Sequence, residues 1–216
     1  MYRIGMSAMI ERIRALGAAA DGAVMVEFSI FATLLLTVTC GMVDFSMALY
    51  QWNAAAKAVE LGARLAAVSD PVASDITTIS GIGGGVNPGD PMPYFKRVCS
   101  GATQSCSNGG TYSATAMNTL VYGRGKTVCG SLASGQLAAM CDVYPGLTGN
   151  NVTITYEQTG LGFAGKPGGP SPTITVEITG LTFDFVFLNG LLGLAPINMP
   201  TMRTTITGED LSTAGS

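Results

Sequence analysis

The stretch Gly22-Ala23-Val24-Met25-Val26-Glu27-Phe28 decides how this 216-residue chain is organised. It begins an apolar run that extends to Val43, and a helix over residues 23–43 would be about 30 Å long, enough to cross the hydrocarbon core of a bilayer. Glu27 is the only charged side chain in this run. Because an unpaired carboxylate in lipid is costly, Glu27 is a candidate functional residue.

Charges on either side of the run predict its orientation. The preceding segment carries three arginines against Glu11 and Asp21, whereas the residues after the run carry Asp44 and then only Lys57 and Arg64. The positive-inside rule therefore predicts a cytoplasmic N-terminus and an exported remainder. The arginines are Arg3, Arg12 and Arg14.

Two alternatives share this apolar run. A cleavable secretory signal would use the small residues around 46–48 or 54–56, but the run from Phe28 to Val43 is long for such a signal and follows a carboxylate. An uncleaved signal anchor would look the same as a helix. The spacing between Gly22 and Glu27 is the feature that separates these alternatives from a processed precursor.

The helix is predicted to continue beyond the apolar run. Apolar residues recur at spacings of three and four, and Pro71 ends the pattern, so the helix should run to about Val68. We expect residues 53–68 to pack on the chain's own domain and residues 23–45 to pack on other subunits. The apolar positions are Phe45, Leu49, Trp52, Ala56, Val59, Ala63 and Ala66.

A glycine, four residues, a glutamate and an aromatic residue behind a basic leader resemble the processing site of type IV-like prepilins. The stretch from Gly22 to about Val68 resembles more closely a TadE-like minor pseudopilin of the tight-adherence (Flp) pilus system. Four segments carry this resemblance: Val26-Glu27-Phe28, Asp44-Phe45, Ala48-Leu49-Tyr50 and Glu60-Leu61-Gly62-Ala63-Arg64.

The resemblance implies a processing site at Gly22, Ala23, Glu27 and Phe28. A prepilin peptidase would cut after Gly22 in the bacterial inner membrane, leaving a single-pass protein with a periplasmic domain. Glu27 would then pair with the N-terminal amine of a neighbouring pilin or pseudopilin subunit during assembly. The other implied partner is the pilus assembly machinery, and whether the chain enters the extracellular fibre stays open.

Five cysteines divide unevenly along the chain. Cys40 lies in the apolar run, and the other four lie in the exported part, where two disulfides are expected. The short spacings favour Cys99–Cys106 and Cys129–Cys141. Free thiols are one alternative, and a zinc site is another, although the spacings lack a short zinc knuckle.

The exported part is predicted to be α+β. Residues 69–150 are rich in glycine and cysteine, with short helices expected at 113–122 and 131–141, and residues 151–216 form a C-terminal β region. Period-two alternation predicts strands near residues 152–156 and 174–178. Residues 202–207 are a third candidate strand of an antiparallel sheet, and residues 160–172 are expected to be a connection. The apolar segment 181–199 is interpreted as buried core. The alternative is a surface that docks on pilin or membrane.

Composition argues against other function classes. The chain has no histidine, which removes the commonest general base and metal ligand, and no long basic cluster for nucleic acid. Gly160-Leu161-Gly162-Phe163-Ala164-Gly165 satisfies a dinucleotide-binding pattern but is followed by Lys166-Pro167, which cannot open the required helix. We therefore predict no enzyme activity, cofactor or metal. The predicted function is a structural minor pseudopilin, and the alternative is an uncleaved membrane-anchored ligand-binding or sensor domain.

Overall fold

The computed structural model describes residues 20–130, 135, 137–209 and 211–212, and most of the predicted leader (residues 1–22) lies outside this part. The described chain forms two compact units. The helical unit contains the N-terminal part of helix α2 up to Met47 together with Phe185–Ala195. The sheet unit contains Ala48–Asp184 and the residues from Pro196 onward.

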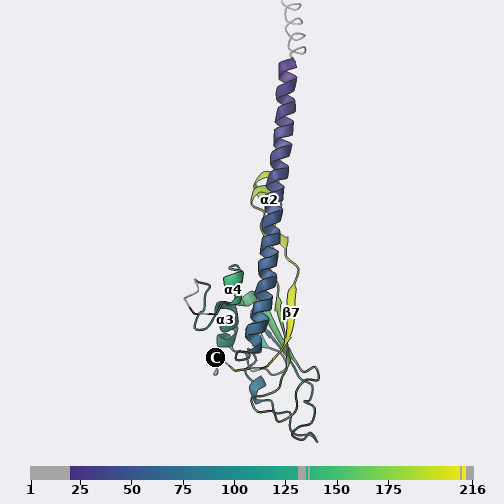
Figure 1. Cartoon of the computed structure of the whole chain (residues 1–216), viewed down its shortest axis with the longest axis vertical. Coiled ribbons are helices and arrows are strands. Elements are labelled where there is room, and N and C mark those ends of the chain that lie inside the picture. Colours follow the sequence, from purple (N-terminus) through teal and green to yellow (C-terminus); the bar gives the residue numbers. More distant parts are fainter. Residues whose placement is uncertain (1–19, 131–134, 136, 210, 213–216) are drawn as a thin grey trace, which may run out of the picture. The chain divides into compact units, whose positions relative to one another are not determined.

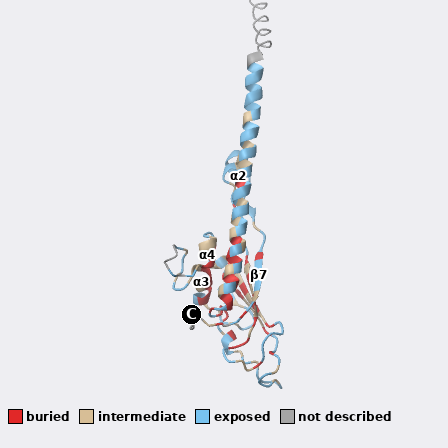
Figure 2. Ribbon diagram, in the orientation of Figure 1, coloured by how far each residue is buried: buried red, intermediate tan, exposed pale blue. Residues whose placement is uncertain are grey.

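Helix α2 (Ala20–Ala67) is continuous, and its end agrees with the predicted end near Val68 (Figure 1). The burial of its side chains changes along its length (Figure 2). Residues 22–43 are mostly exposed, whereas the small residues of the last three turns alternate with exposed polar ones. The buried set is Ala55, Ala58, Val59, Gly62, Ala63, Ala66 and Ala67.

This buried face confirms the prediction that residues 53–68 pack on the chain's own domain. Small side chains allow the helix to approach its neighbours closely. At Gly62 the approach leaves no room for a side chain, since a Cβ atom there would lie 2.5 Å from Sδ of Met140. The predicted stripe is correct at Val59, Ala63 and Ala66, but its first members, Phe45, Leu49 and Trp52, are exposed.

The sheet unit is built on a five-stranded antiparallel sheet in the order β2-β1-β3-β4-β7. The three predicted strands are present, and alternate residues of β3 and β4 point into the core, as period-two alternation predicts. The strands are β1 (Lys96–Ser100), β2 (Ser105–Cys106), β3 (Val152–Glu157), β4 (Thr173–Ile178) and β7 (Met202–Thr207).

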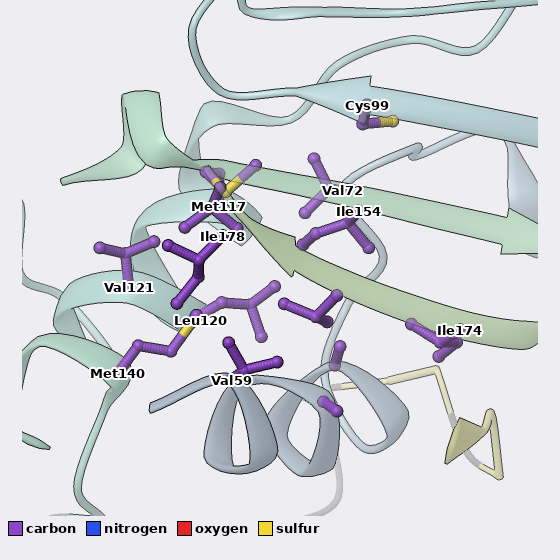
Figure 3. Packing of buried hydrophobic residues seen from close by; sticks show 14 of the residues in the cluster. Val59, Val72, Cys99, Met117, Leu120, Val121, Met140, Ile154, Ile174 and Ile178 are labelled. Carbon is purple, nitrogen blue, oxygen red and sulfur yellow. The ribbon is translucent and has the colours of Figure 1, made fainter. Parts of the chain in front are cut away.

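Helices from the sheet unit pack against the inner face of this sheet (Figure 3). Helix α3 (Ala114–Tyr122) begins at the Ser113 N-cap, whose side chain accepts a hydrogen bond from the Ala116 N–H, and this confirms the helix predicted at 113–122. Figure 3 shows Val59 of α2 facing Ile154 and Ile178 of the sheet, so one apolar core joins these elements.

The helix predicted at 131–141 is wrong in its bounds. Residues 131–134 and 136 lie outside the described part, and the described helix, α4 (Met140–Val143), begins only at Met140. Ala139 is extended, and its N–H donates to the Asp142 carboxylate at 2.7 Å. This local hydrogen bond starts a short helix where composition suggested a longer one.

Tyr156 of β3 links the sheet to the residues that follow α2. Its side chain is fully buried, and its hydroxyl oxygen accepts a hydrogen bond from the Val72 N–H at 2.9 Å. Burial raises the pKa of the Tyr156 phenol well above its usual value of 10.0, because the anionic form would lose its hydration. The hydrogen bond from Val72 opposes this increase without cancelling it.

The remaining elements are short. Two 3₁₀ helices, η1 (Ile76–Thr78) and η2 (Gly149–Asn151), lie in the connections, and β5 (Thr182–Phe183) pairs with β6 (Ile197–Asn198). Helix α5 (Phe187–Leu192) ends at Gly193, which adopts the left-handed conformation. The glycine-rich segment 160–165 is irregular, as predicted for a connection, and residues 166–172, which follow it directly, form no helix.

Candidate functional site

The predicted processing site lies in the first turns of helix α2. Gly22, Ala23, Glu27 and Phe28 are all exposed, and apart from the adjacent residues and the local helix backbone, no atom of the described chain lies within 4 Å of the position that a Cβ atom on Gly22 would occupy. The peptide bond between Gly22 and Ala23 is therefore uncovered by the described part of the chain. Glycine also lowers helix stability by about 1 kcal/mol relative to alanine, which favours local unwinding near a helix end.

Glu27 has no ion-pair partner within the described residues. The nearest basic residue that follows it on α2 is Lys57, thirty positions away or about 45 Å along the axis. Lys57 pairs instead with Glu60, at a nitrogen–oxygen distance of 3.2 Å. A positive charge for Glu27 must therefore come from outside the described residues.

Glu27 stands within an apolar stripe of the same helix. Val24, Phe28, Phe31 and Leu34 follow one another at spacings of three and four, so they share a face, and all of them are exposed. Hydroxyl groups elsewhere in the run are satisfied inside the helix. Ser29, for example, donates to the Met25 carbonyl at 2.8 Å.

The same type of bond is made by Thr33, Thr37, Thr39 and Ser46. These bonds lower the cost of placing polar side chains in lipid. The exposed face of residues 23–43 is thus suited to contact with lipid or with other apolar helices. Within this face the Glu27 carboxylate is the group that needs a positively charged partner.

Asp44 has a role that the sequence did not suggest. Its side chain is 0% exposed although it ends an exposed apolar run. Both carboxylate oxygens accept hydrogen bonds from backbone N–H groups at the start of α5: Val186 at 3.2 Å, Phe187 at 3.1 Å and Leu188 at 2.8 Å. A carboxylate at a helix N-terminus satisfies N–H groups that have no partner within the helix, so Asp44 fixes α5 to α2.

The sequence gives only a weak indication that Asp44 has this role. Asp44 is the first charged residue after the apolar run, and it belongs to the Asp44-Phe45 pair that contributed to the family resemblance. Its partners lie more than 140 residues later in the chain. No spacing pattern can predict such a contact.

The interpretation of segment 181–199 as buried core is wrong for most of its length. Leu181 and Phe183 are buried, but the residues around α5 are exposed. The reason is that α5 is a short helix attached through its backbone N–H groups and not through a buried side-chain face. The exposed set is Val186, Phe187, Leu191, Leu192, Leu194 and Ile197.

The four cysteines beyond the apolar run pair as the short spacings favoured. Cys99 is bonded to Cys106 across the β1–β2 hairpin, and Cys129 is bonded to Cys141 at the start of α4. These four sulfurs are therefore not available as zinc ligands. Cys40 remains a free thiol.

Comparison with known proteins identifies the N-terminal segment. Residues 22–64 match the family model described as TadE-like protein, which agrees with the resemblance found in the residues. The matched range contains Gly22, Glu27 and Asp44. Comparisons with curated proteins and with solved structures gave no match.

Proposed function

We propose that this chain, a TadE-like protein by its residues 22–64 and so associated with the tight-adherence pilus system, is a minor pseudopilin that assists pilus assembly. It would be made as a precursor with a cytoplasmic leader and a single membrane helix. The apolar part of α2 is long enough to cross a bilayer, which supports membrane anchoring.

Cleavage after Gly22 by a prepilin peptidase is the first step of the proposal. The observation that supports cleavage most directly is that Gly22 is exposed and unobstructed in a TadE-like segment. Glu27, five residues later, is exposed as well. Cleavage would create a positively charged amine on Ala23. It would also remove the basic leader.

Glu27 would then pair with the Ala23 amine of a neighbouring subunit. The absence of any cation near Glu27 in the described chain supports a partner in another molecule. A paired carboxylate in lipid is far less costly than an isolated one, so the pair would favour docking of subunits before they leave the membrane. Other pilins, pseudopilins and the assembly machinery are the proposed partners.

A second candidate function is an uncleaved membrane-anchored domain that binds a ligand. One observation favours it: the sheet unit contains a cavity of about 390 Å³. The cavity is lined by apolar Leu65, Val68 and Leu137 together with basic Arg124 and Lys126. This lining would suit a small amphipathic anion.

Intact-mass analysis of the protein purified from membranes tests the proposal. The expected mass is that of a chain beginning at Ala23, and Gly22→Leu should leave the precursor uncut because an isobutyl group crowds the scissile bond. Gly22→Ala adds one methyl group and serves as the matched control, with processing retained. A full-length mass for the wild-type protein purified from the membranes of cells that make pili would refute the proposed cleavage and favour the second candidate.

A further inference from the structure

The segment Phe185–Ala195 presents an apolar surface without charge. Val186 is 63% exposed and Leu192 is 59% exposed, and Phe187, Leu191 and Leu194 are exposed beside them. The sequence contains no acidic or basic residue between Asp184 and Arg203. Exposed apolar surface of this kind marks an interaction site.

Contacts inside the helical unit fix where this surface lies on α2. The Asp44 carboxylate holds the backbone of Val186, Phe187 and Leu188, and a Cβ atom on Gly41 would lie 3.9 Å from Cδ1 of Leu188. The segment therefore lies beside residues 41–44. These residues form the C-terminal end of the apolar run of α2.

The position of residues 41–44 along α2 corresponds to one edge of a bilayer. Residues 23–43 span about 30 Å as a helix, which equals the thickness of the hydrocarbon core, so residues 41–44 would lie at the boundary between acyl chains and headgroups. Amphipathic helices bind at this boundary by burying their apolar face about 5–10 Å deep.

The charge on Asp44 does not oppose such burial. Its oxygens are already withdrawn from solvent and accept hydrogen bonds from three backbone N–H groups. Covering this side of the helical unit with lipid would therefore desolvate no exposed charge. The exposed apolar surface of α2 is continuous with it, because Gly41 and Asp44 belong to the same helix.

We propose that Phe185–Ala195 inserts into the bilayer interface beside α2 as a second membrane contact, with lipid acyl chains covering Phe187, Leu191 and Leu192. This inference depends on the membrane anchoring in the proposed function. On helix α5 the exposed Phe187, Leu191 and Leu192 share one side, and the uncharged Asn189 and Gly190 lie on the other, which suits a short helix that lies in the interface with its apolar side toward the acyl chains. The insertion would also restrict rotation of α2 about its own axis.

Tryptophan quenching in the full chain tests the proposal. The only tryptophan is removed by Trp52→Phe, and single tryptophans are introduced in that background by Leu192→Trp, Leu34→Trp or Tyr94→Trp. Each variant is reconstituted into vesicles of phosphatidylethanolamine and phosphatidylglycerol with brominated acyl chains. A parallel measurement uses unbrominated vesicles with iodide equilibrated on both sides.

The tryptophan at position 192 should lose most of its emission to brominated lipid and little to iodide. Tyr94→Trp is the control at an exposed position of the sheet unit, and it should show the opposite response. Quenching at position 192 by iodide alone would overturn the inference. Protection from both quenchers would also overturn it, because the surface would then be covered by protein, such as a second copy of the chain.

Leu34→Trp distinguishes failure of the inference from failure of membrane anchoring. Position 34 lies in the middle of the apolar run and should be quenched strongly by brominated lipid. If position 34 is quenched and position 192 is not, α2 spans the bilayer and only the inference fails. If neither position is quenched by lipid, the membrane anchoring of the proposed function fails together with the inference.

Discussion

Glu27 is the residue on which the proposed assembly step depends. Its carboxylate is exposed on an apolar face and has no cation within the described chain. Two roles are possible for such a group in a TadE-like segment: recognition by the peptidase, or pairing with the amine of a neighbouring subunit. The two roles affect different steps, so one substitution separates them.

We predict that Glu27→Gln allows cleavage after Gly22 but leaves the mature protein unassembled in the inner membrane. Glutamine keeps the shape and the hydrogen-bonding capacity but removes the charge, so the neighbour's amine would have no anionic partner at low dielectric. Intact mass reports cleavage, and cell fractionation reports assembly. Loss of cleavage with normal assembly of the remaining mature chains would indicate the peptidase role instead.

Asp44 offers a second prediction at the residue scale. Asp44→Asn should weaken the attachment of α5, because hydrogen bonds to an ionised group contribute about 1.5–3 kcal/mol and the amide cannot accept through both of its terminal atoms. Hydrogen exchange at Val186–Leu188 should accelerate by at least about tenfold. The matched control is Asp90→Asn, which removes a carboxylate that accepts from the Asn87 N–H at 2.7 Å.

The control substitution should leave exchange at Val186–Leu188 unchanged. Equal exchange rates in wild-type protein and Asp44→Asn would mean that the carboxylate does not hold the segment. The same result would weaken the argument that Phe185–Ala195 lies at the membrane boundary.

Among the elements, α4 depends on a covalent link. The Cys129–Cys141 disulfide ties the start of this four-residue helix to the preceding loop. Cys129→Ser should lower the free energy of unfolding of the sheet unit by about 2–5 kcal/mol, the usual cost of losing a native disulfide. Denaturant titration of the detergent-solubilised full chain measures this change.

Cys40→Ser is the matched control for the cysteine series. Cys40 is unpaired, and a serine on this helix can donate to a carbonyl of the preceding turn as Ser29 does. Its unfolding should therefore resemble that of the wild type. Equal stability of the Cys129→Ser and Cys40→Ser variants would contradict a structural role for the disulfide.

Strand β3 carries the buried hydroxyl that meets the Val72 N–H. Tyr156→Phe should cost about 1–3 kcal/mol at neutral pH, because the buried N–H loses its acceptor. The raised pKa of Tyr156 gives a second effect. In the folded protein the phenol keeps its proton above pH 10.0, whereas the unfolded chain releases it, so the free energy of unfolding falls as pH rises above 10.0.

The Tyr156→Phe protein should consequently lose less stability above pH 10.0 than the wild type does. Denaturation curves on both sides of that pH measure the difference. Tyr50→Phe, at an exposed tyrosine of α2, should leave the stability at neutral pH unchanged. If the free energy of unfolding fell equally with pH in the wild type and in Tyr156→Phe, the Tyr156 phenol would not be the cause of the pH dependence.

Across the whole molecule, the elements that could be predicted from the sequence are those in which apolar residues recur at a regular spacing. Helix α2 and strands β3 and β4 have sustained periodicity, so their positions follow from local residue order. Strand β1 was not predicted, since only Cys99 among its five residues is buried and no clear alternation results. The bounds of α4 depend on Asp142 and on a disulfide, neither of which produces a helical pattern.

Whether an apolar segment is buried in the protein or exposed on its surface was harder to predict than whether the segment is a helix or a strand. An apolar sequence such as Leu181–Met199 is compatible with a protein core and with a lipid-facing surface, because both favour the same residues. The contact between Asp44 and α5 joins distant parts of the chain and leaves no local pattern. The processing site stays a prediction, and it could be made from the sequence because one short spacing relates Gly22 to Glu27.

The central claim is the proposal that this chain, whose residues 22–64 match the TadE-like model, assists assembly of a tight-adherence pilus. The most direct test is to count pili by electron microscopy in a strain lacking the chain and in the same strain complemented with the wild type or with Glu27→Gln. We predict few or no pili without the chain, restoration by the wild type and no restoration by Glu27→Gln. Normal piliation in the strain that lacks the chain would contradict the claim.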